Sequence, residues 1–195
     1  RARPRAMLVG DLPFMSYQAG VADAVRSAGR LVKEGGAEAV KLEGGKRMEP
    51  VIRAIVDAAI PVMGHVGLTP QSVHQLGGYR VQGKEPHDAD RLVEDAKLLE
   101  QYGCFAVVVE GTPWQVAKRI TESLSIPTIG IGAGVHCDGQ VLVVNDLLGM
   151  SEEFAPRFVK RYAEMGKQMG AAFEAYIEDV KTGRFPDLDH SYTSD

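Results

Sequence analysis

The sequence predicts an α/β fold built on a parallel sheet, and two patterns carry this prediction. Short segments that are apolar on both faces recur along the chain, as expected of strands buried in a parallel sheet. Amphipathic stretches separate them, and a repeated strand-then-helix order requires right-handed crossovers between parallel strands. We expect strands over residues 6–10, 37–42, 61–66, 105–109, 127–131 and 140–144.

Four helices are predicted between these strands from apolar residues spaced three or four apart. The apolar faces of the first three consist of Tyr17, Val21, Ala24, Ala28 and Leu31; of Val51, Ile52, Ile55, Val56 and Ala59; and of Leu92, Ala96, Leu99 and Tyr102. The sequence Thr112-Pro113-Trp114-Gln115 predicts a capping box with Thr112 at the N-cap of the fourth helix, which runs to about Leu124.

The length of 195 residues indicates one domain. A doubly wound sheet and a (β/α) barrel both fit the pattern, but a closed barrel needs eight strands and six are predicted. If the fold is a barrel, two β/α units are missing, and the absence of an initiator Met before Arg1 suggests that they are missing from the front. We therefore expect a single barrel domain over residues 1–195.

A C-terminal helical extension is predicted over about residues 156–181. Gly166 and Gly170 are positions where it would break or kink. Its large apolar stripe would pack on its own domain or help to build a subunit interface. The stripe consists of Phe158, Tyr162, Met165, Met169, Phe173, Tyr176 and Val180.

Composition excludes several classes of protein. Hydrophobic residues at 45% and charged residues at 25% are typical of a folded domain. A net charge of −4 disfavours a nucleic-acid binder, and no apolar run is long enough to predict a membrane span. Two cysteines without paired spacing, Cys104 and Cys137, indicate a reducing compartment, so we expect a cytoplasmic protein without a structural zinc site.

Ionisable residues follow the predicted strands where each strand ends, which is where parallel β/α folds place their sites. Each has a simpler interpretation alone, as a helix cap, a snorkelling lysine, a solvated loop acid or a buried histidine. Their convergence on one rim favours a functional site. The set is Asp11, Lys41, Glu43, His65 and Glu110.

These residue types suit proton abstraction next to a carbonyl group. Asp11 and Glu43 are hard oxygen ligands that favour Mg²⁺ over zinc. Lys41 would neutralise a developing oxyanion, and Glu110 would act as the general base.

Two glycine-rich stretches border this rim. The run 130–134 resembles a phosphate loop only weakly, and its glycines would more simply allow close approach to substrate or to a neighbouring loop. Residues 67–84 are either a lid or a surface excursion.

Six ordered motifs resemble the ketopantoate hydroxymethyltransferase family. They are DLPFM at 11–15, VKLEGG at 40–45, GHVGLTPQS at 64–72, GGYRVQGK at 77–84, VEGTP at 109–113, and IGIGAG with DGQVLV within 129–143. The resemblance implies a (β/α)8 TIM barrel, of which about six units are present. It also implies Mg²⁺, a homo-oligomer (a decamer), and transfer of a one-carbon unit from 5,10-methylenetetrahydrofolate to 3-methyl-2-oxobutanoate. The product would be 2-dehydropantoate, in the first committed step of pantothenate synthesis.

The same resemblance implies roles for the five rim residues. Asp11 resembles a metal ligand that also lies at the substrate, Glu43 an outer metal-site carboxylate, and Lys41 the lysine that contacts the 2-oxo acid. Glu110 resembles the general base, and His65 an active-site histidine. The family's earlier strand ending in Gly-Asp-Ser, which supplies a further metal ligand, has no counterpart in the 195 residues.

Two alternatives remain at this point. One is a Mg²⁺-dependent 2-oxo acid lyase of the phosphoenolpyruvate mutase and isocitrate lyase kind, although the reactive-cysteine lid motif of those enzymes is absent. The other is a truncated, non-catalytic remnant that serves as an assembly partner.

Overall fold

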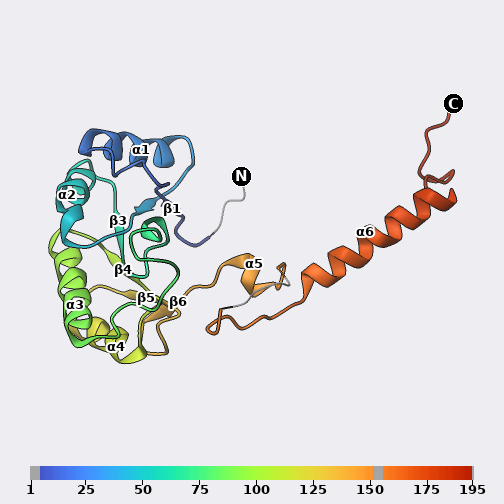
Figure 1. Cartoon of the computed structure of the whole chain (residues 1–195). Helices are drawn as coiled ribbons and strands as arrows, with labels where there is room; N and C mark the ends of the chain where they lie inside the picture. Colours follow the sequence, from blue (N-terminus) through green and yellow to red (C-terminus); the bar gives the residue numbers. More distant parts are fainter. Residues whose placement is uncertain (1–4, 152–155, 195) are drawn as a thin grey trace. The chain divides into compact units, whose positions relative to one another are not determined.

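A computed structural model describes residues 5–151 and 156–194 (Figure 1). Two compact units make up the chain, Arg1–Val141 and Leu142–Asp195. The first unit holds the sheet and all five rim residues. In the described part of the chain, no helix combines the length and the apolar character needed to cross a bilayer.

The first unit is built on a six-stranded sheet whose strand order follows the chain, with every neighbouring pair parallel. This confirms the predicted parallel sheet and the positions of its first five strands. The strands are β1 Val9–Asp11, β2 Ala39–Lys41, β3 Val62–Gly67, β4 Ala106–Glu110, β5 Thr128–Ile131 and β6 Gly139–Gln140.

The last strand differs most from its prediction over 140–144. It ends at Gln140, and helix α5 (Val144–Leu147) begins where the strand was expected to continue. The N–H of Val141 still donates a hydrogen bond to the Gly130 carbonyl of β5. Because β5 ends at Ile131, it offers no backbone partner to the residues after Val141. The apolar valines that follow are exposed rather than buried in a sheet.

Helices α1 to α4 lie along the outside of the curled sheet (Figure 1). A doubly wound sheet would reverse its strand order and carry helices on both faces. The sequential order and one-sided helices therefore support a partial TIM barrel. The helices are α1 Val21–Lys33, α2 Glu49–Asp57, α3 Pro86–Gln101 and α4 Trp114–Ser123, with short 3₁₀ turns η1 Lys46–Met48 and η2 Pro70–Ser72.

The core lies between the sheet and these helices. Alternate strand residues Val40, Val62, Val107 and Val109 are fully buried on the face toward the helices. They belong to one apolar cluster with helix residues that include Ala28, Ile52, Ile55, Leu99 and Ile120. The opposite face of the sheet, which these helices do not cover, carries polar side chains at the carboxyl ends of the strands.

Three helix-end predictions are wrong. Tyr17 precedes α1, although it is buried in the same apolar cluster as Ala24 and Ala28, and its hydroxyl bonds to polar partners. Ala59 lies beyond the end of α2, with a positive φ of 60°. Thr112 is not the N-cap of α4: Pro113 takes that position, and its carbonyl accepts the N–H groups of residues 116 and 117. No side-chain cap bond forms.

In the second unit, helix α6 (Met165–Thr182) begins later than the predicted start near residue 156. The N–H groups of Tyr162, Met165 and Gly166 donate to carbonyls at and just after the end of α5. In a helix that began near residue 156, these N–H groups would instead donate to carbonyls four residues earlier in the same helix. The predicted break at Gly166 and Gly170 is also wrong, because α6 runs through both.

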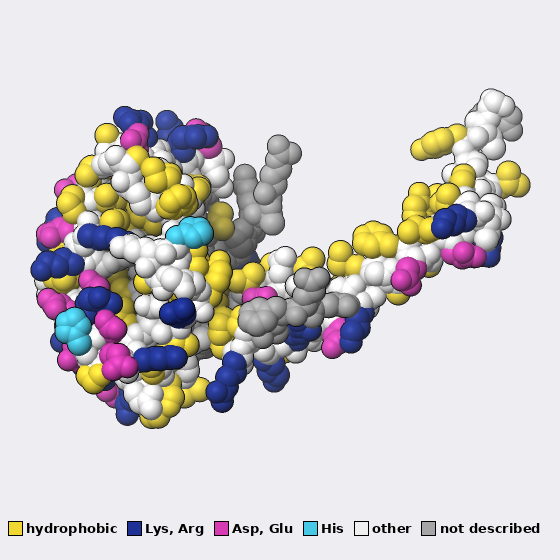
Figure 2. All heavy atoms as spheres, viewed as in Figure 1, with side chains coloured by type: hydrophobic (Ala, Val, Ile, Leu, Met, Phe, Trp, Pro, Cys, Tyr) yellow, Lys and Arg dark blue, Asp and Glu magenta, His cyan; other side chains and the backbone are white. Residues whose placement is uncertain are grey.

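The apolar stripe of α6 is exposed, with no buried residue along the helix (Figure 2). Phe173 is 61% exposed and Tyr176 is 57% exposed. Among the described residues of the second unit, Phe185 contacts the ring of Tyr176, yet the stripe stays largely exposed. Its role in a subunit interface stays a prediction.

Candidate active site

Strand register places the predicted site residues on one face of the sheet. Asp11 pairs in register with Lys41, and Lys41 with Met63, two residues before His65. His65 pairs with Val108, two residues before Glu110. Because side chains alternate along a strand, these residues share the face opposite the helices.

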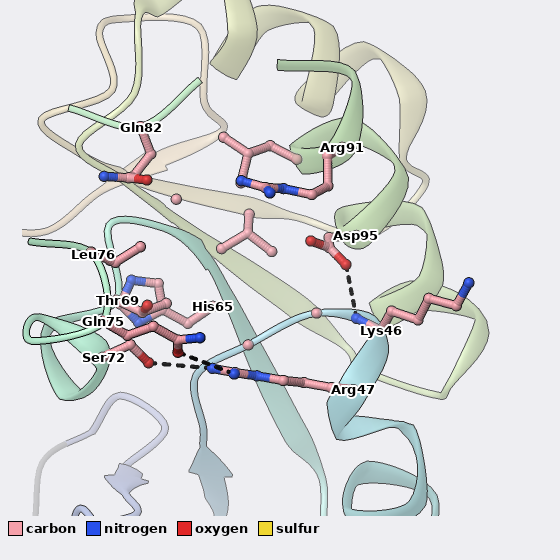
Figure 3. Close-up of a pocket in the computed structure, with 15 residues that line it drawn as sticks. Lys46, Arg47, His65, Thr69, Ser72, Gln75, Leu76, Gln82, Arg91 and Asp95 are labelled. Carbon is pink, nitrogen blue, oxygen red and sulfur yellow. Dashed lines mark hydrogen bonds between the residues drawn. The ribbon is translucent and has the colours of Figure 1, made fainter. Parts of the chain in front are cut away.

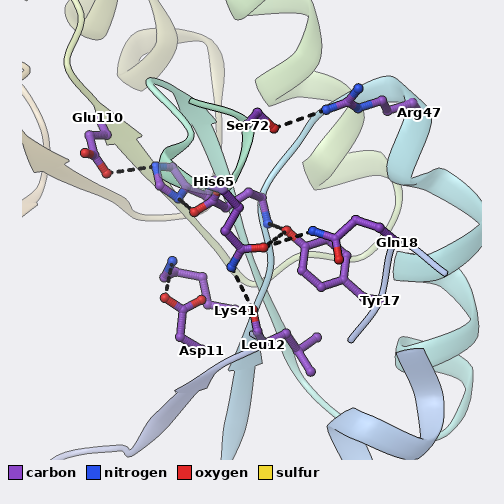
Figure 4. Close-up of polar contacts among 11 residues, drawn as sticks. Asp11, Leu12, Tyr17, Gln18, Lys41, Arg47, His65, Ser72 and Glu110 are labelled. Carbon is purple, nitrogen blue, oxygen red and sulfur yellow. Dashed lines mark hydrogen bonds and ion pairs between the residues drawn. The ribbon is translucent and has the colours of Figure 1, made fainter. Parts of the chain in front are cut away.

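The carboxyl edge of the sheet brings the five predicted residues into two contact groups (Figure 4). In one, Lys41 Nζ lies 2.9 Å from Asp11 Oδ2. In the other, His65 lies between two acids, with Nε2 3.2 Å from Glu110 Oε2 and Nδ1 3.9 Å from Glu43 Oε1.

His65 is the most deeply buried member of the set, with its side chain 2% exposed. Neither ring nitrogen makes a well-directed hydrogen bond within the described residues, although both face a carboxylate. Buried polar atoms are nearly always hydrogen-bonded, so such an exception needs an explanation. An imidazole held in this state is suited to exchange a proton with an adjacent acid or a bound ligand.

Glu43 is held by a network that the sequence reasoning did not find. Its Oε2 accepts the N–H of Gln71 at 2.9 Å, and its own backbone N–H donates to the Tyr17 hydroxyl at 3.1 Å. Tyr17 in turn donates to Gln71 Oε1 at 2.8 Å, and Gln71 Nε2 donates to the Leu12 carbonyl at 2.8 Å. Gln71 therefore ties the ends of β1 and β2 to the segment that follows β3.

Two signals for this network lay in the sequence. Gln71 belongs to the quoted 64–72 motif, but a neutral amide carried no obvious chemistry. Tyr17 matched a helical spacing and was therefore assigned to a core face. Its phenol is buried, which raises the pKa of Tyr17 to about 12, so at neutral pH the hydroxyl is present as a donor.

The protonation of Glu43 is also set by this environment. Burial raises the pKa of its carboxyl, and the nearby charge of Asp11 adds to the effect. The His65 ring, the Gln71 N–H and Lys41 act in the opposite direction but do not outweigh burial. Glu43 and Asp11 are thus close enough to influence each other electrostatically.

The position of Glu110 depends on a glycine in the neighbouring strand. Gly67 has a φ of +95°, and a Cβ there would lie 2.1 Å from the Glu110 carbonyl oxygen. The next residue, Leu68, donates its N–H to that same oxygen at 2.8 Å. Only glycine combines this backbone conformation with so close an approach, so Gly67 fixes the end of β4.

The glycine run at 130–134 packs against its own unit. A Cβ on Gly134 would lie 2.4 Å from Trp114 Cβ, and one on Gly130 would lie 3.0 Å from Cys137 Sγ. This agrees with the expectation of close approach to a neighbouring segment. Residues 67–84 supply Gln71 to the site, while their role as a lid stays a prediction.

The carboxylates present suit magnesium better than a closed zinc site. Within residues 5–151 and 156–194, no group of three or more His, Cys, Asp or Glu side chains is arranged to hold a metal ion. Mg²⁺ is commonly bound by one or two carboxylates and completes its shell with water and substrate oxygens. Asp11 and Glu43, two carboxylates at the carboxyl ends of the neighbouring strands β1 and β2, fit that requirement.

Comparisons with known proteins agree with the motif resemblance. A family model described as ketopantoate hydroxymethyltransferase matches residues 1–188. The chain is 59% identical over 193 residues to the 3-methyl-2-oxobutanoate hydroxymethyltransferase of Geobacter metallireducens, covering 99% of this chain and 72% of that protein. It is 57% identical over 195 residues to the enzyme of the same name from Clostridium acetobutylicum, covering 100% of this chain and 71% of that protein.

Solved structures are more distant. An N-acetylneuraminate lyase from Fusobacterium nucleatum is similar over 63% of this chain and 44% of its own, with a TM-score of 0.43 and 12% identity. A similarity at this level indicates no function.

Proposed function

Because the chain belongs to the ketopantoate hydroxymethyltransferase family, we propose that it transfers a one-carbon unit from 5,10-methylenetetrahydrofolate to 3-methyl-2-oxobutanoate. The product would be 2-dehydropantoate, on the route to pantothenate. One observation carries the assignment of the site: two acid–base groups, Lys41–Asp11 and Glu43–His65–Glu110, lie at one carboxyl edge of the sheet.

Glu110 is the proposed general base. Its side chain is 17% exposed, so it is accessible to a substrate while most of it is shielded from water. It removes the proton from C3 of the 2-oxo acid, and the His65 ring, with Nε2 3.2 Å from the Glu110 carboxylate, is close enough to accept that proton in turn. We therefore keep His65 with Glu110 in the proposed catalytic pair.

Asp11 and Lys41 are the proposed substrate-contacting pair. The Lys41 ammonium, held 2.9 Å from Asp11, is positioned to approach the keto oxygen as negative charge develops on it. Asp11 and Glu43 would hold Mg²⁺ at this edge. When bound there, Mg²⁺ would supply electrophilic stabilisation of the same negative charge.

Carbon–carbon bond formation then joins C3 of the deprotonated acid to the methylene carbon of the folate. The carbon–nitrogen bonds to that carbon break, one water supplies the hydroxyl oxygen, and tetrahydrofolate is released.

The rival lyase reaction requires a reactive cysteine. Burial raises the pKa of the Cys104 thiol to about 12 and also raises the pKa of Cys137. Both thiols are therefore protonated at neutral pH, and neither is one of the rim residues. This supports the transferase over the lyase.

Exchange of the C3 proton of 3-methyl-2-oxobutanoate in D₂O, followed by NMR with and without Mg²⁺, tests the first half of this reaction without folate. We expect exchange that depends on Mg²⁺ and disappears when EDTA is added. Formation of 2-dehydropantoate from 5,10-methylenetetrahydrofolate then tests the second half. Absence of both activities would contradict the proposal.

Assembly and location remain part of this proposal. We retain the predicted homo-oligomer, with the exposed α6 stripe as the candidate contact surface. The two free cysteines are consistent with the predicted cytoplasmic location.

A further inference from the structure

A cavity with His65 in its lining opens beside η1, α3 and the segment that follows β3 (Figure 3). It has a volume of about 470 Å³, and Arg91, Leu92 and Asp95 line it from the middle of α3. This volume falls in the range typical of ligand sites and exceeds what a five-carbon acid occupies. The cavity therefore has room for a larger molecule than the proposed 2-oxo acid.

Two arginines from different elements face this cavity. Arg47 extends from η1 along one side, and Arg91 extends from α3 on the opposite side (Figure 3). Arg47 donates to the neutral oxygens of Gln75 at 3.3 Å and Ser72 at 3.4 Å. Among the described residues no carboxylate forms an ion pair with it.

Only a weak ion pair, with Asp88, competes with an incoming anion for the Arg91 guanidinium. Its ion pair with Asp88, at 3.2 Å, is largely exposed, and exposed pairs of this kind contribute little. The one acid that lines the cavity, Asp95, is already engaged, since it accepts the backbone N–H of Lys46 at 2.8 Å. A carboxylate entering between the two guanidinium groups would thus gain charge-assisted bonds at small cost.

The cavity leads to the reacting centre. His65 lines its wall and lies 3.2 Å from Glu110, the proposed base. Gln75 and Gln82 add neutral amides to the same lining, with both donors and acceptors. The lining therefore offers one arginine on each of two opposite sides, neutral amides, and the ring of His65.

We propose that this pocket binds the one-carbon donor, with Arg47 and Arg91 holding the carboxylates of its glutamate tail. The amide lining receives the heteroaromatic ring and directs its methylene carbon toward His65. This inference rests on the proposed function, because it takes the folate donor from there. It adds the location of the donor and the chemistry that recognises it.

The test uses two probes that differ only in the tail. Tetrahydrofolate carries the glutamate, and tetrahydropteroate lacks it. We expect calorimetry on the wild-type protein to show tighter binding of tetrahydrofolate. In Arg47→Gln and Arg91→Gln, its Kd and the KM for 5,10-methylenetetrahydrofolate rise roughly 10-fold or more, from the strength of bonds to charged groups. Binding of tetrahydropteroate changes by less than twofold.

Arg53→Gln is the matched control, since Arg53 lies on α2, pairs with Glu49 at 2.9 Å and does not line the cavity. It should leave both constants unchanged. C3 exchange, which needs no donor, identifies any variant whose fold is disturbed.

The inference and the proposed function fail in different ways. If both arginine variants keep wild-type KM and Kd for the donor, or lose affinity equally for both probes, the pocket assignment is overturned. Product formation by the wild-type protein would still stand in that case. If the wild-type protein forms no product, the proposed function fails, whereas the calorimetric comparison still decides whether the pocket recognises the glutamate tail.

Discussion

The two faces of the sheet use alternate residues of the same strands for opposite purposes. On the helix side, Val40, Val62, Val107 and Val109 are fully buried in one apolar cluster. On the other side, the register aligns Lys41 and its neighbours into a row of ionisable groups. The first face supplies stability through burial, and the second keeps charged groups close together at a cost in stability that the first must offset.

This division means that substitutions on the two faces should have separable effects. Changes on the polar face should alter rate more than stability, whereas changes on the helix face should alter stability more than rate. Four variants test that separation.

The largest expected effect is from Glu110→Gln on the polar face. Loss of the general base should lower kcat by roughly 10²–10⁴-fold, because a positioned base contributes about that much. Thermal unfolding should shift little, since glutamine keeps the shape of the side chain. Glu122→Gln, on the exposed surface of α4, serves as the control. Near-normal turnover in Glu110→Gln would remove Glu110 from the mechanism.

Leu99→Ala tests the helix face. Leu99 is fully buried on α3 against Gly64 of β3, and removing its side chain should cost about 2–5 kcal/mol of unfolding free energy. Denaturant unfolding measures this cost. The folded fraction should keep its C3 exchange rate. A variant that loses exchange without losing stability would show that the two faces are not independent.

Tyr17→Phe should affect both rate and stability, because Tyr17 is buried but carries a polar hydroxyl. The change leaves the backbone N–H of Glu43 without its acceptor, which should cost about 1–3 kcal/mol. It also removes one of the hydrogen bonds that hold the Gln71 side chain, so the KM for the 2-oxo acid should rise. Tyr79→Phe, at an exposed position, should change neither quantity. If Tyr17→Phe behaves like that control, the network does not position Glu43.

Glu43 should give the smallest effect, seen as a dependence on pH. Burial raises the pKa of Glu43 above its unfolded value, so the unfolded state loses this proton first as the pH rises. Stability from this group is therefore greatest below the unfolded pKa and falls as the pH rises through the folded pKa. Glu43→Gln should flatten that part of the stability profile, whereas the exposed Glu94→Gln should not. An unchanged profile in Glu43→Gln would contradict the role of burial.

The sequence alone was sufficient for the first five strands and for the residues on the polar row. Long apolar runs located β3 and β4 closely, because a strand buried on both sides leaves a strong signal. The ends of elements were harder. The end of β6 depends on where β5 stops offering a partner, and the start of α6 depends on bonds to the α5 region, and neither is visible in local spacing.

The sequence predicted which ionisable residues lie at the rim, but not the contacts between them. The sequence identified Asp11, Lys41, Glu43, His65 and Glu110 as residues of one rim. It could not show that His65 lies between two acids, since that follows from register across three strands. Gln71 and Tyr17 were missed because their importance comes from long-range bonds rather than from ionisable chemistry.

The alternation along β3 has a consequence for how this protein tolerates length changes. His65 and Val66 are adjacent, yet one contacts the acids and the other joins the apolar cluster. Deleting a single residue early in β3 would exchange their faces, placing an imidazole in the core and a valine between the acids. The strand would be only one residue shorter, but its alternation would be out of phase from the deletion onward. Point substitutions can therefore change one face at a time, whereas a single-residue insertion or deletion in this strand changes both at once.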